Sequence, residues 1–151
     1  SRCQSIRVMP LTKEEQQLVK ERRPAVEDDD ANQFMEIFFD LMNAVTSKDL
    51  MGALECGESM AALDSREKQK AFCNFAACCI RKIFMLQQNL QQIADISEED
   101  FAFCADMAAK CPEGFCMKAI ANIEKVVAMI DRNVSSKILF CDLVNRIFMN
   151  I

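Results

Sequence analysis

The sequence contains no histidine, no tryptophan and no tyrosine among its 151 residues. Without histidine there is no imidazole to serve as a general base, to activate a serine or cysteine nucleophile, or to bind zinc or haem in the usual way. The sequence also offers no glycine-rich loop of the kind that holds phosphates, and no nucleophile–base pair. These absences exclude most familiar classes of enzyme, so we expect a protein without enzymatic activity and without haem.

Glycine and proline are scarce, with three of each. Few turns can be built from so small a number, which favours long helices with short connections over a β sandwich. No apolar run is long enough to span a membrane. Apolar residues still make up 51% of the chain, which is enough for a globular core.

Positive charge is also in deficit, because 18 lysines and arginines stand against 23 aspartates and glutamates, for a net charge of −5. An acidic protein is a poor candidate for binding nucleic acid, which needs a basic surface. An acidic surface instead fits a cation or a basic helix of a partner protein.

Apolar residues recur at helical spacing along most of the sequence. Over residues 31–42 they lie at i, i+3, i+4 and i+7, which predicts one apolar stripe on a helix. The stripe consists of Phe34, Ile37, Phe38 and Leu41. The same spacing recurs over residues 70–86, 98–111, 116–130 and 142–151, while strand-type alternation is nearly absent. The sequence therefore predicts an all-α fold, with a tail at residues 1–10 and a single domain at residues 11–151. If the domain divides into two lobes, we expect them at residues 11–77 and 78–151.

Nine cysteines are many for this length, and an odd number cannot all pair within one chain. Two of them are adjacent, and most of the others fall on apolar helix faces, where cysteine behaves as a small buried hydrophobe. We therefore expect free thiols in a reducing compartment, the cytoplasm. An alternative stays open for three of them, which could be disulfide partners or soft-metal ligands: Cys104, Cys111 and Cys116. No signal peptide is visible, but Ser1 is not an initiator methionine. Secretion of a processed chain therefore stays open as an alternative.

One twelve-residue segment, DRNVSSKILFCD, begins and ends on an acid and carries oxygen-bearing side chains two residues apart. Its first, third, fifth, seventh and twelfth positions hold Asp131, Asn133, Ser135, Lys137 and Asp142. With the apolar residues on both sides, the segment resembles the helix–loop–helix unit of the EF-hand family. In that family these positions bind Ca²⁺, the seventh through its backbone carbonyl. The resemblance implies one calcium site, with Ile138 at the eighth position pairing with a sister loop.

Two residues depart from the family's pattern. Ser136 stands at the sixth position, where glycine normally gives the backbone a positive φ, and a serine there costs on the order of 1 kcal/mol. Asp142 stands at the twelfth position, where the longer glutamate is usual. Both departures weaken the expected affinity for calcium.

Shorter segments repeat only the end of such a loop. Residues 45–50 (VTSKDL) and 96–101 (ISEEDF) resemble the point where an EF-hand loop enters its second helix, and a more degenerate loop begins at Asp64. The same pattern, Ser or Thr followed three residues later by Asp or Glu, is also the signature of an ordinary helix cap. The resemblance implies helix–loop–helix units packed as a compact or two-lobed bundle, calmodulin-like or penta-EF-hand-like, in which most calcium sites are lost.

Ten methionines and eleven phenylalanines make up an unusual apolar composition. Methionine is flexible and polarizable, so it suits grooves that accept varied apolar side chains; the alternative is that it fills the core. In the EF-hand interpretation a C-terminal groove is lined by Met107, Met117, Met129 and Met149, and an N-terminal groove by Met35, Met42, Met51 and Met60. The implied function is that of a calmodulin-like or light-chain-like protein that binds an amphipathic, basic helical segment of a partner.

Two other interpretations of the helical pattern stay open. The segment SKDLMG at residues 47–52 resembles a joint between early globin helices, and without a histidine ligand such a protein would be a haemless sensor or scaffold. In a secreted protein, the cysteines would staple a helical bundle that binds a lipid or a receptor.

Overall fold

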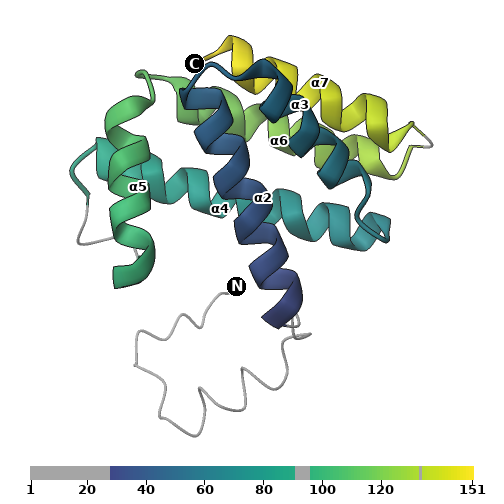
Figure 1. The fold of residues 1–151 in the computed structure, drawn as a ribbon, viewed down its shortest axis with the longest axis horizontal. Helices are drawn as coiled ribbons and strands as arrows, with labels where there is room; N and C mark the ends of the chain where they lie inside the picture. Colours follow the sequence, from purple (N-terminus) through teal and green to yellow (C-terminus); the bar gives the residue numbers. More distant parts are fainter. Residues whose placement is uncertain (1–27, 91–95, 133) are drawn as a thin grey trace, which may run out of the picture. The chain divides into compact units, whose positions relative to one another are not determined.

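A computed structural model of the chain describes residues 28–90, 96–132 and 134–151. They form the helices α2 (Asp28–Thr46), α3 (Leu50–Ala61), α4 (Arg66–Gln87), α5 (Glu98–Lys110), α6 (Phe115–Ile130) and α7 (Ser136–Met149), shown in Figure 1. These described ranges contain no strand, so the predicted all-α fold is confirmed. The predicted tail at residues 1–10 lies outside them. Within the same ranges, no helix combines the length and the apolar character needed to cross a membrane.

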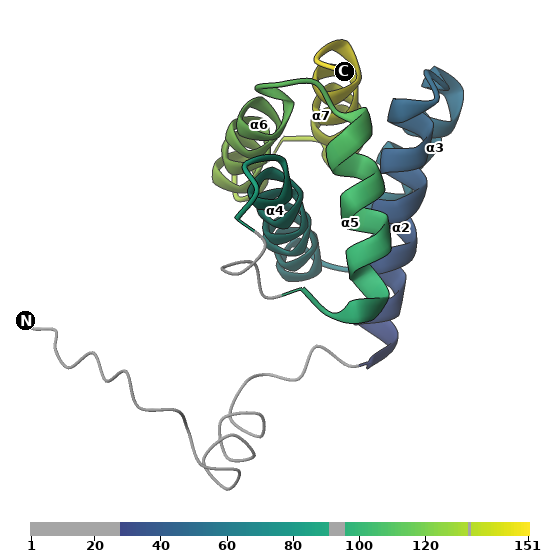
Figure 2. The same cartoon turned by 90° about the vertical axis from the view of Figure 1, so that its left-hand side faces the viewer.

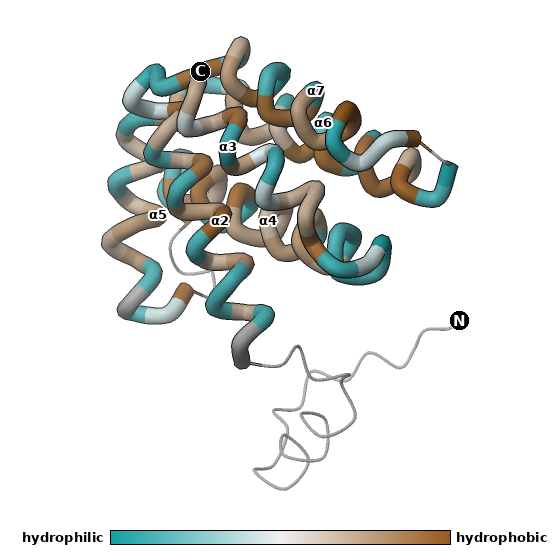
Figure 3. Tube along the Cα trace, turned by 45° about the vertical axis from the view of Figure 1, so that its right-hand side comes forward, coloured by the Kyte–Doolittle hydropathy of each residue, from teal (hydrophilic) through white to brown (hydrophobic). Residues whose placement is uncertain are grey.

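Residues 34–151 form one compact unit in which α4 is the central helix. α5 and α6 pack against α4, and α7 packs against both α6 and α3 (Figure 2). Hydrophobic and hydrophilic residues alternate along the helices in Figure 3, as expected where each helix buries one face. The boundary expected between two lobes, after residue 77, lies inside α4, which continues across it without a break.

The sequence of α4 explains its central position. Ser65 caps the helix by accepting a hydrogen bond from the Lys68 N–H at 3.1 Å. Over the next turns, apolar residues recur at helical spacing on the buried face: Phe72, Cys73, Ala76, Ala77, Ile80, Ile83 and Leu86. Burying each large side chain of this kind contributes about 1.5–3 kcal/mol, so packing on this face stabilises the neighbouring helices.

Two glutamines hold the ends of α4 to its neighbours. Gln69 is only 5% exposed; its Nε2 donates to the Ala61 carbonyl at 3.4 Å, and its Oε1 accepts from Ser136 Oγ at 3.4 Å. At the other end, Gln87 Nε2 donates to the Cys111 carbonyl at 3.0 Å. Because buried polar groups require partners, these two amides determine where the end of α3, the start of α7 and the end of α5 meet α4.

Phenylalanine rings join α2 to α4 and α5. Phe34 meets Phe72 edge-on with ring centroids 5.6 Å apart. The Phe103 ring of α5 lies 6.2 Å from that of Phe38 and 4.1 Å from that of Phe39. Such pairs add about 0.5–1.5 kcal/mol each beyond the area they bury. The predicted stripe on α2 is therefore a core face.

The connections between helices are short because capping side chains start the next helix at once. Asp49 Oδ1 accepts from the Gly52 N–H at 3.1 Å and begins α3, and Ser97 Oγ accepts from the Asp100 N–H at 3.3 Å and begins α5. The two segments that resemble the end of an EF-hand loop are therefore helix caps, preceded in the first case by a turn too short to hold a twelve-residue loop. EF-hand helix–loop–helix units are not confirmed.

α3 and α7 run antiparallel and approach closely at Gly57. A Cβ atom at Gly57 would lie 3.2 Å from Val144 Cγ2 and 3.4 Å from the Phe140 carbonyl oxygen. Near this point Lys137 Nζ, in the first turn of α7, lies 3.3 Å from Glu58 Oε1. The absence of a side chain at Gly57 therefore sets the distance between the two helices.

Replacing Gly57 with leucine should lower the free energy of unfolding by about 1–3 kcal/mol, because the larger side chain forces α3 away from α7. Urea unfolding followed by circular dichroism measures the change. Glu58→Leu is the matched control, since it adds the same side chain at an exposed position and loses only a surface ion pair, worth less than about 1 kcal/mol. Equal losses in the two variants would contradict the close approach at Gly57.

All eight cysteines in the described ranges are free thiols. The buried ones are Cys56, Cys73, Cys104, Cys111 and Cys116. Burial raises the pKa of the Cys73 thiol from 9.0 to about 12. Burial, with the nearby Cys111 as a second cause, raises the pKa of the Cys116 thiol to about 12 as well. The folded protein therefore keeps these protons in a pH range where the unfolded chain loses them.

With a reductant present, stability should fall as the pH rises from about 9 towards about 12, because the unfolded state then binds fewer protons than the folded state. Below that window both states hold the thiol protons and the effect is absent. Urea midpoints at several pH values measure it, and no tyrosine titrates in the same range. Cys73→Ala should flatten the pH dependence, whereas Cys78→Ala, at an exposed position, should not. An unchanged slope in Cys73→Ala would refute this account.

Candidate functional site

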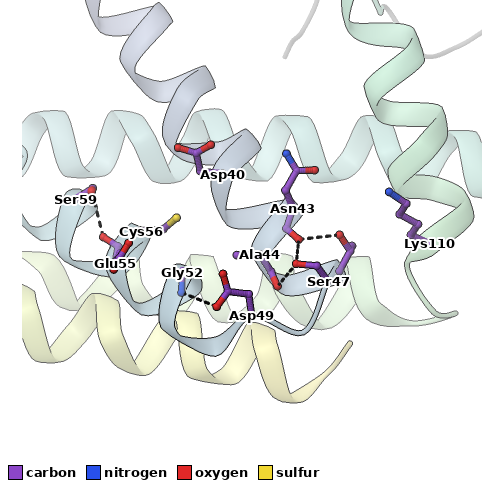
Figure 4. A pocket seen from close by; sticks show the side chains of 11 residues that line it. Asp40, Asn43, Ala44, Ser47, Asp49, Gly52, Glu55, Cys56, Ser59 and Lys110 are labelled. Atoms are coloured by element: carbon purple, nitrogen blue, oxygen red, sulfur yellow. Dashed lines mark hydrogen bonds between the residues drawn. The ribbon is translucent and has the colours of Figure 1, made fainter.

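A polar hollow on the described surface lies where α2 turns into α3. It is an open pocket of about 610 Å³ beside the end of α5 (Figure 4). Its lining consists of Asp40, Asn43, Ala44, Thr46, Ser47, Asp49, Gly52, Glu55, Cys56, Ser59 and Lys110. Most of these side chains are acidic or hydroxyl-bearing, so the pocket differs in character from the apolar core beneath it.

The tight turn at residues 46–49 shapes this pocket. Ser47 donates to the Asn43 carbonyl through both its N–H, at 3.0 Å, and its Oγ, at 2.7 Å. Lys48 adopts a positive φ of 63°, and the Asp49 N–H then donates to the Ala44 carbonyl at 2.8 Å. These bonds end α2 and reverse the chain, so that α3 starts beside the last turn of α2.

Gly52 leaves room for the Asp49 carboxylate. A Cβ atom at Gly52 would lie 2.5 Å from Asp49 Oδ2, closer than any real contact. A larger residue at this position would make the flexible end of the Asp49 side chain shift, next to the N–H group that it caps at the start of α3. The glycine therefore leaves room for one acidic group at the edge of the pocket.

The pocket is electrostatically negative. Asp40, Asp49 and Glu55 contribute three carboxylates, and the terminal carbonyl groups of α2 add the negative end of a helix dipole. The one cation in the lining, Lys110, lies 2.8 Å from Asp106 Oδ2, outside the pocket, which offsets its charge. A positively charged group entering this space would be stabilised.

The Cys56 thiol at the pocket responds to that field. Burial raises its pKa from 9.0 to about 11, with Asp40, Glu55 and Asp49 as further causes in that order. Since the thiolate is the reactive form, a thiol with so high a pKa is a poor nucleophile at neutral pH. The pocket therefore offers fixed negative charge and hydrogen-bonding groups rather than an activated nucleophile.

Of the five residues predicted to bind calcium, the four that the structure describes are not gathered into a metal site. α7 begins at Ser136, so Lys137 and Asp142 lie on a helix, and Ser135 is its N-cap. Asp131 Oδ2 is 2.6 Å from Lys70 Nζ, and Asp142 Oδ2 is 2.8 Å from Arg146 Nε. Asn133 lies outside the described residues. Nowhere in the described ranges do three or more acidic or cysteine side chains gather as a metal site would require.

α7 therefore begins inside the predicted twelve-residue loop, and the reason is local. Leu139, Phe140 and Leu143 are buried by helical packing, and this packing begins the helix inside the expected loop. Ile138, predicted to pair with a sister loop, is instead 67% exposed on the outer face of α7. The calcium site therefore stays a prediction, which the arrangement of the described residues does not support.

The methionines predicted to line two grooves are divided between core and surface. Met42, Met60 and Met107 are at most 1% exposed and fill the core, and Met35 is half-buried. The exposed members, on three different helices, are Met51 at 69%, Met117 at 56%, Met129 at 38% and Met149 at 76%. The buried members agree with the alternative that methionine fills the core, and the two methionine-lined grooves stay a prediction.

No family model matches the chain, and neither a curated protein nor a solved structure matches it significantly. The resemblances to EF-hand proteins and to globins thus stay predictions. Sequence reasoning also missed the acidic pocket, because its carboxylates come from two helices and the turn between them. The sequence feature that could have indicated the pocket is the segment TSKD at residues 46–49, which reverses the chain between two amphipathic helices.

Adding calcium should leave the thermal stability of the protein unchanged. A site occupied at about 100 times its dissociation constant would raise the free energy of unfolding by about 2.7 kcal/mol. Differential scanning calorimetry with calcium, and with magnesium as the control for ionic strength, measures this difference. A stabilisation by calcium that Asp131→Asn abolishes would show that residues 131–142 rearrange to form the site that the sequence pattern predicts.

Proposed function

We propose that this protein is a non-enzymatic binding module that holds a basic, amphipathic helical segment of a partner protein. In this proposal, the acidic pocket at the α2–α3 turn receives a lysine or arginine side chain of that segment. The observation that carries the proposal is the convergence of Asp40, Asp49 and Glu55 on one open pocket of about 610 Å³.

The charge of the pocket favours a side-chain cation over a bound metal ion. A metal ion needs several ligand oxygens converging on one point at about 2–2.6 Å, and the described residues contain no such group of three. A long ammonium or guanidinium side chain needs only a negative field and hydrogen-bond acceptors spread over a wider space. The carboxylates and the hydroxyl groups of Ser47 and Ser59 supply both.

Apolar side chains next to the pocket supply the second element of recognition. Leu50 and Met51, directly after Asp49, are 41% and 69% exposed. Lys48 Nζ donates to the Ile151 carbonyl at 2.9 Å, which brings the end of α7, and with it the exposed Met149, to the start of α3. A partner helix with apolar residues beside a basic one would therefore find both kinds of contact around a single turn.

Thiol chemistry does not compete with this proposal at neutral pH. The pKa of the Cys56 thiol is raised to about 11, so on the order of one molecule in 10⁴ carries the thiolate. The pocket lining contains no histidine to pair with the thiol, and its carboxylates raise the pKa of the thiol rather than lower it. Binding is therefore the activity that these side chains support best.

Titrating the full chain with a basic amphipathic helical peptide should give saturable binding with a negative heat-capacity change. Asp40→Asn and Glu55→Gln should each weaken that binding about two- to fivefold, as expected for the loss of one exposed charge pair. Isothermal titration calorimetry at two salt concentrations measures both effects, and added salt should weaken binding.

Matched controls separate the pocket from general surface charge. Asp64→Asn and Glu113→Gln remove exposed carboxylates that do not line the pocket, and should leave the affinity unchanged. A peptide in which glutamine replaces each lysine and arginine should bind much more weakly than its parent. Equal losses in the pocket and control variants, or flat titrations with several basic peptides, would refute the proposal.

A further inference from the structure

The connection between α5 and α6 brings two cysteines to either side of a tight turn. The Phe115 N–H donates to the Pro112 carbonyl at 3.1 Å, and Gly114, the third residue of this turn, has φ 83° and ψ −12°. These angles are those of a type II turn, which requires glycine or asparagine at its third position. Cys111 directly precedes the turn, and Cys116, the second residue of α6, directly follows it.

One side chain holds both cysteines at this position. Gln87 Nε2 donates to the Cys111 carbonyl at 3.0 Å, and Gln87 Oε1 accepts from Cys116 Sγ at 3.6 Å. Both cysteines are buried, at 6% and 1% exposure. Because a single amide group touches the backbone of one cysteine and the sulfur of the other, the pair shares one small volume between α4, α5 and α6.

We propose that Cys111 and Cys116 are a redox pair whose reversible disulfide closes the turn between α5 and α6. The oxidant is a low-molecular-weight disulfide. One cysteine sulfur attacks it and releases the first small thiol, and the second cysteine then attacks the mixed disulfide and releases the other. The net change removes two hydrogen atoms from the protein and reduces the small disulfide to two thiols. This step is independent of partner binding at the acidic pocket.

The open space beside the turn and the conformation of Cys111 leave room for the pair to close. A pocket of about 550 Å³ lies against the turn and is lined by Gln87, Gly114 and Met117, among others. A Cβ atom built on Gly114 would meet nothing within 4 Å, so the turn faces open space. Cys111 is also the C-cap of α5 with extended backbone angles, outside any helix, so its side chain can reorient towards the geometry that a disulfide demands.

The environment makes the exchange slow at neutral pH. Burial is the main cause that raises the pKa of Cys111 to about 11 and of Cys116 to about 12. Only the thiolate attacks a disulfide. At any pH below those pKa values, the rate of closure should therefore rise about tenfold for each unit by which the pH is increased. The pair therefore responds to a sustained oxidising environment rather than to a brief pulse of oxidant.

Peptide mapping of the intact chain tests the pairing directly, because trypsin cuts after Lys110 and Lys118 and releases both cysteines on one peptide, CPEGFCMK. The full-length protein is incubated with oxidised glutathione, its free thiols are alkylated, and the digest is analysed without reduction. We expect this peptide to be lighter by two hydrogen atoms and unalkylated, and to recover two alkylation sites after reduction. Cys111→Ser or Cys116→Ser should abolish that product, whereas Cys79→Ser and Cys104→Ser should not.

The wild-type map decides the question even if a variant fails to fold. The inference is overturned if both cysteines of this peptide stay alkylated after incubation. It is also overturned if either carries glutathione without closing the ring, or if either is linked to a peptide from elsewhere in the chain. Circular dichroism of the oxidised protein provides the structural control, since closure within the folded turn should leave the helical signal unchanged.

Discussion

Burial of the apolar face of α4 is the constraint on which the rest of the unit depends. α5 and α6 pack on this helix, and α2 reaches it through the contact of Phe34 with Phe72. The acidic pocket and the cysteine pair both lie at chain reversals beside this core, at the ends of helices rather than along their faces. Turns can carry polar and reactive groups because the long helix already supplies the packing energy.

The acidic pocket arises from the same local chemistry that ends one helix and begins another. Asp49 caps α3, Ser47 satisfies a terminal carbonyl of α2, and Gly52 leaves room for the carboxylate. Together these groups concentrate negative charge where the dipole of α2 is also negative. Asp40 and Glu55 extend that field along both helices. The turn between α2 and α3 thereby acquires the negative electrostatic potential expected of a site that binds a cation.

Helical periodicity was sufficient to predict the fold class, because a buried face repeats its apolar residues with the period of the helix. It was insufficient at residues 131–142, where two patterns overlap: oxygen-bearing side chains spaced as in a calcium loop, and Leu139, Phe140 and Leu143 spaced as in a helix. Burial of the apolar set prevails in the structure. Composition likewise could not separate core from surface, since Met107 is buried and Met149 is exposed although both were assigned to one groove.

The placement of glutamine at each end of α4 restricts how the helices can slide along one another. Apolar contacts tolerate a shift by one turn, since leucine and phenylalanine have no directional requirements. The amide of Gln69 does not, because a shifted α7 would remove the Ser136 hydroxyl and leave a buried acceptor unpaired, at a cost of about 1–3 kcal/mol. The core thus provides the cohesion of the bundle, and two uncharged side chains select one alignment among several that would bury similar area.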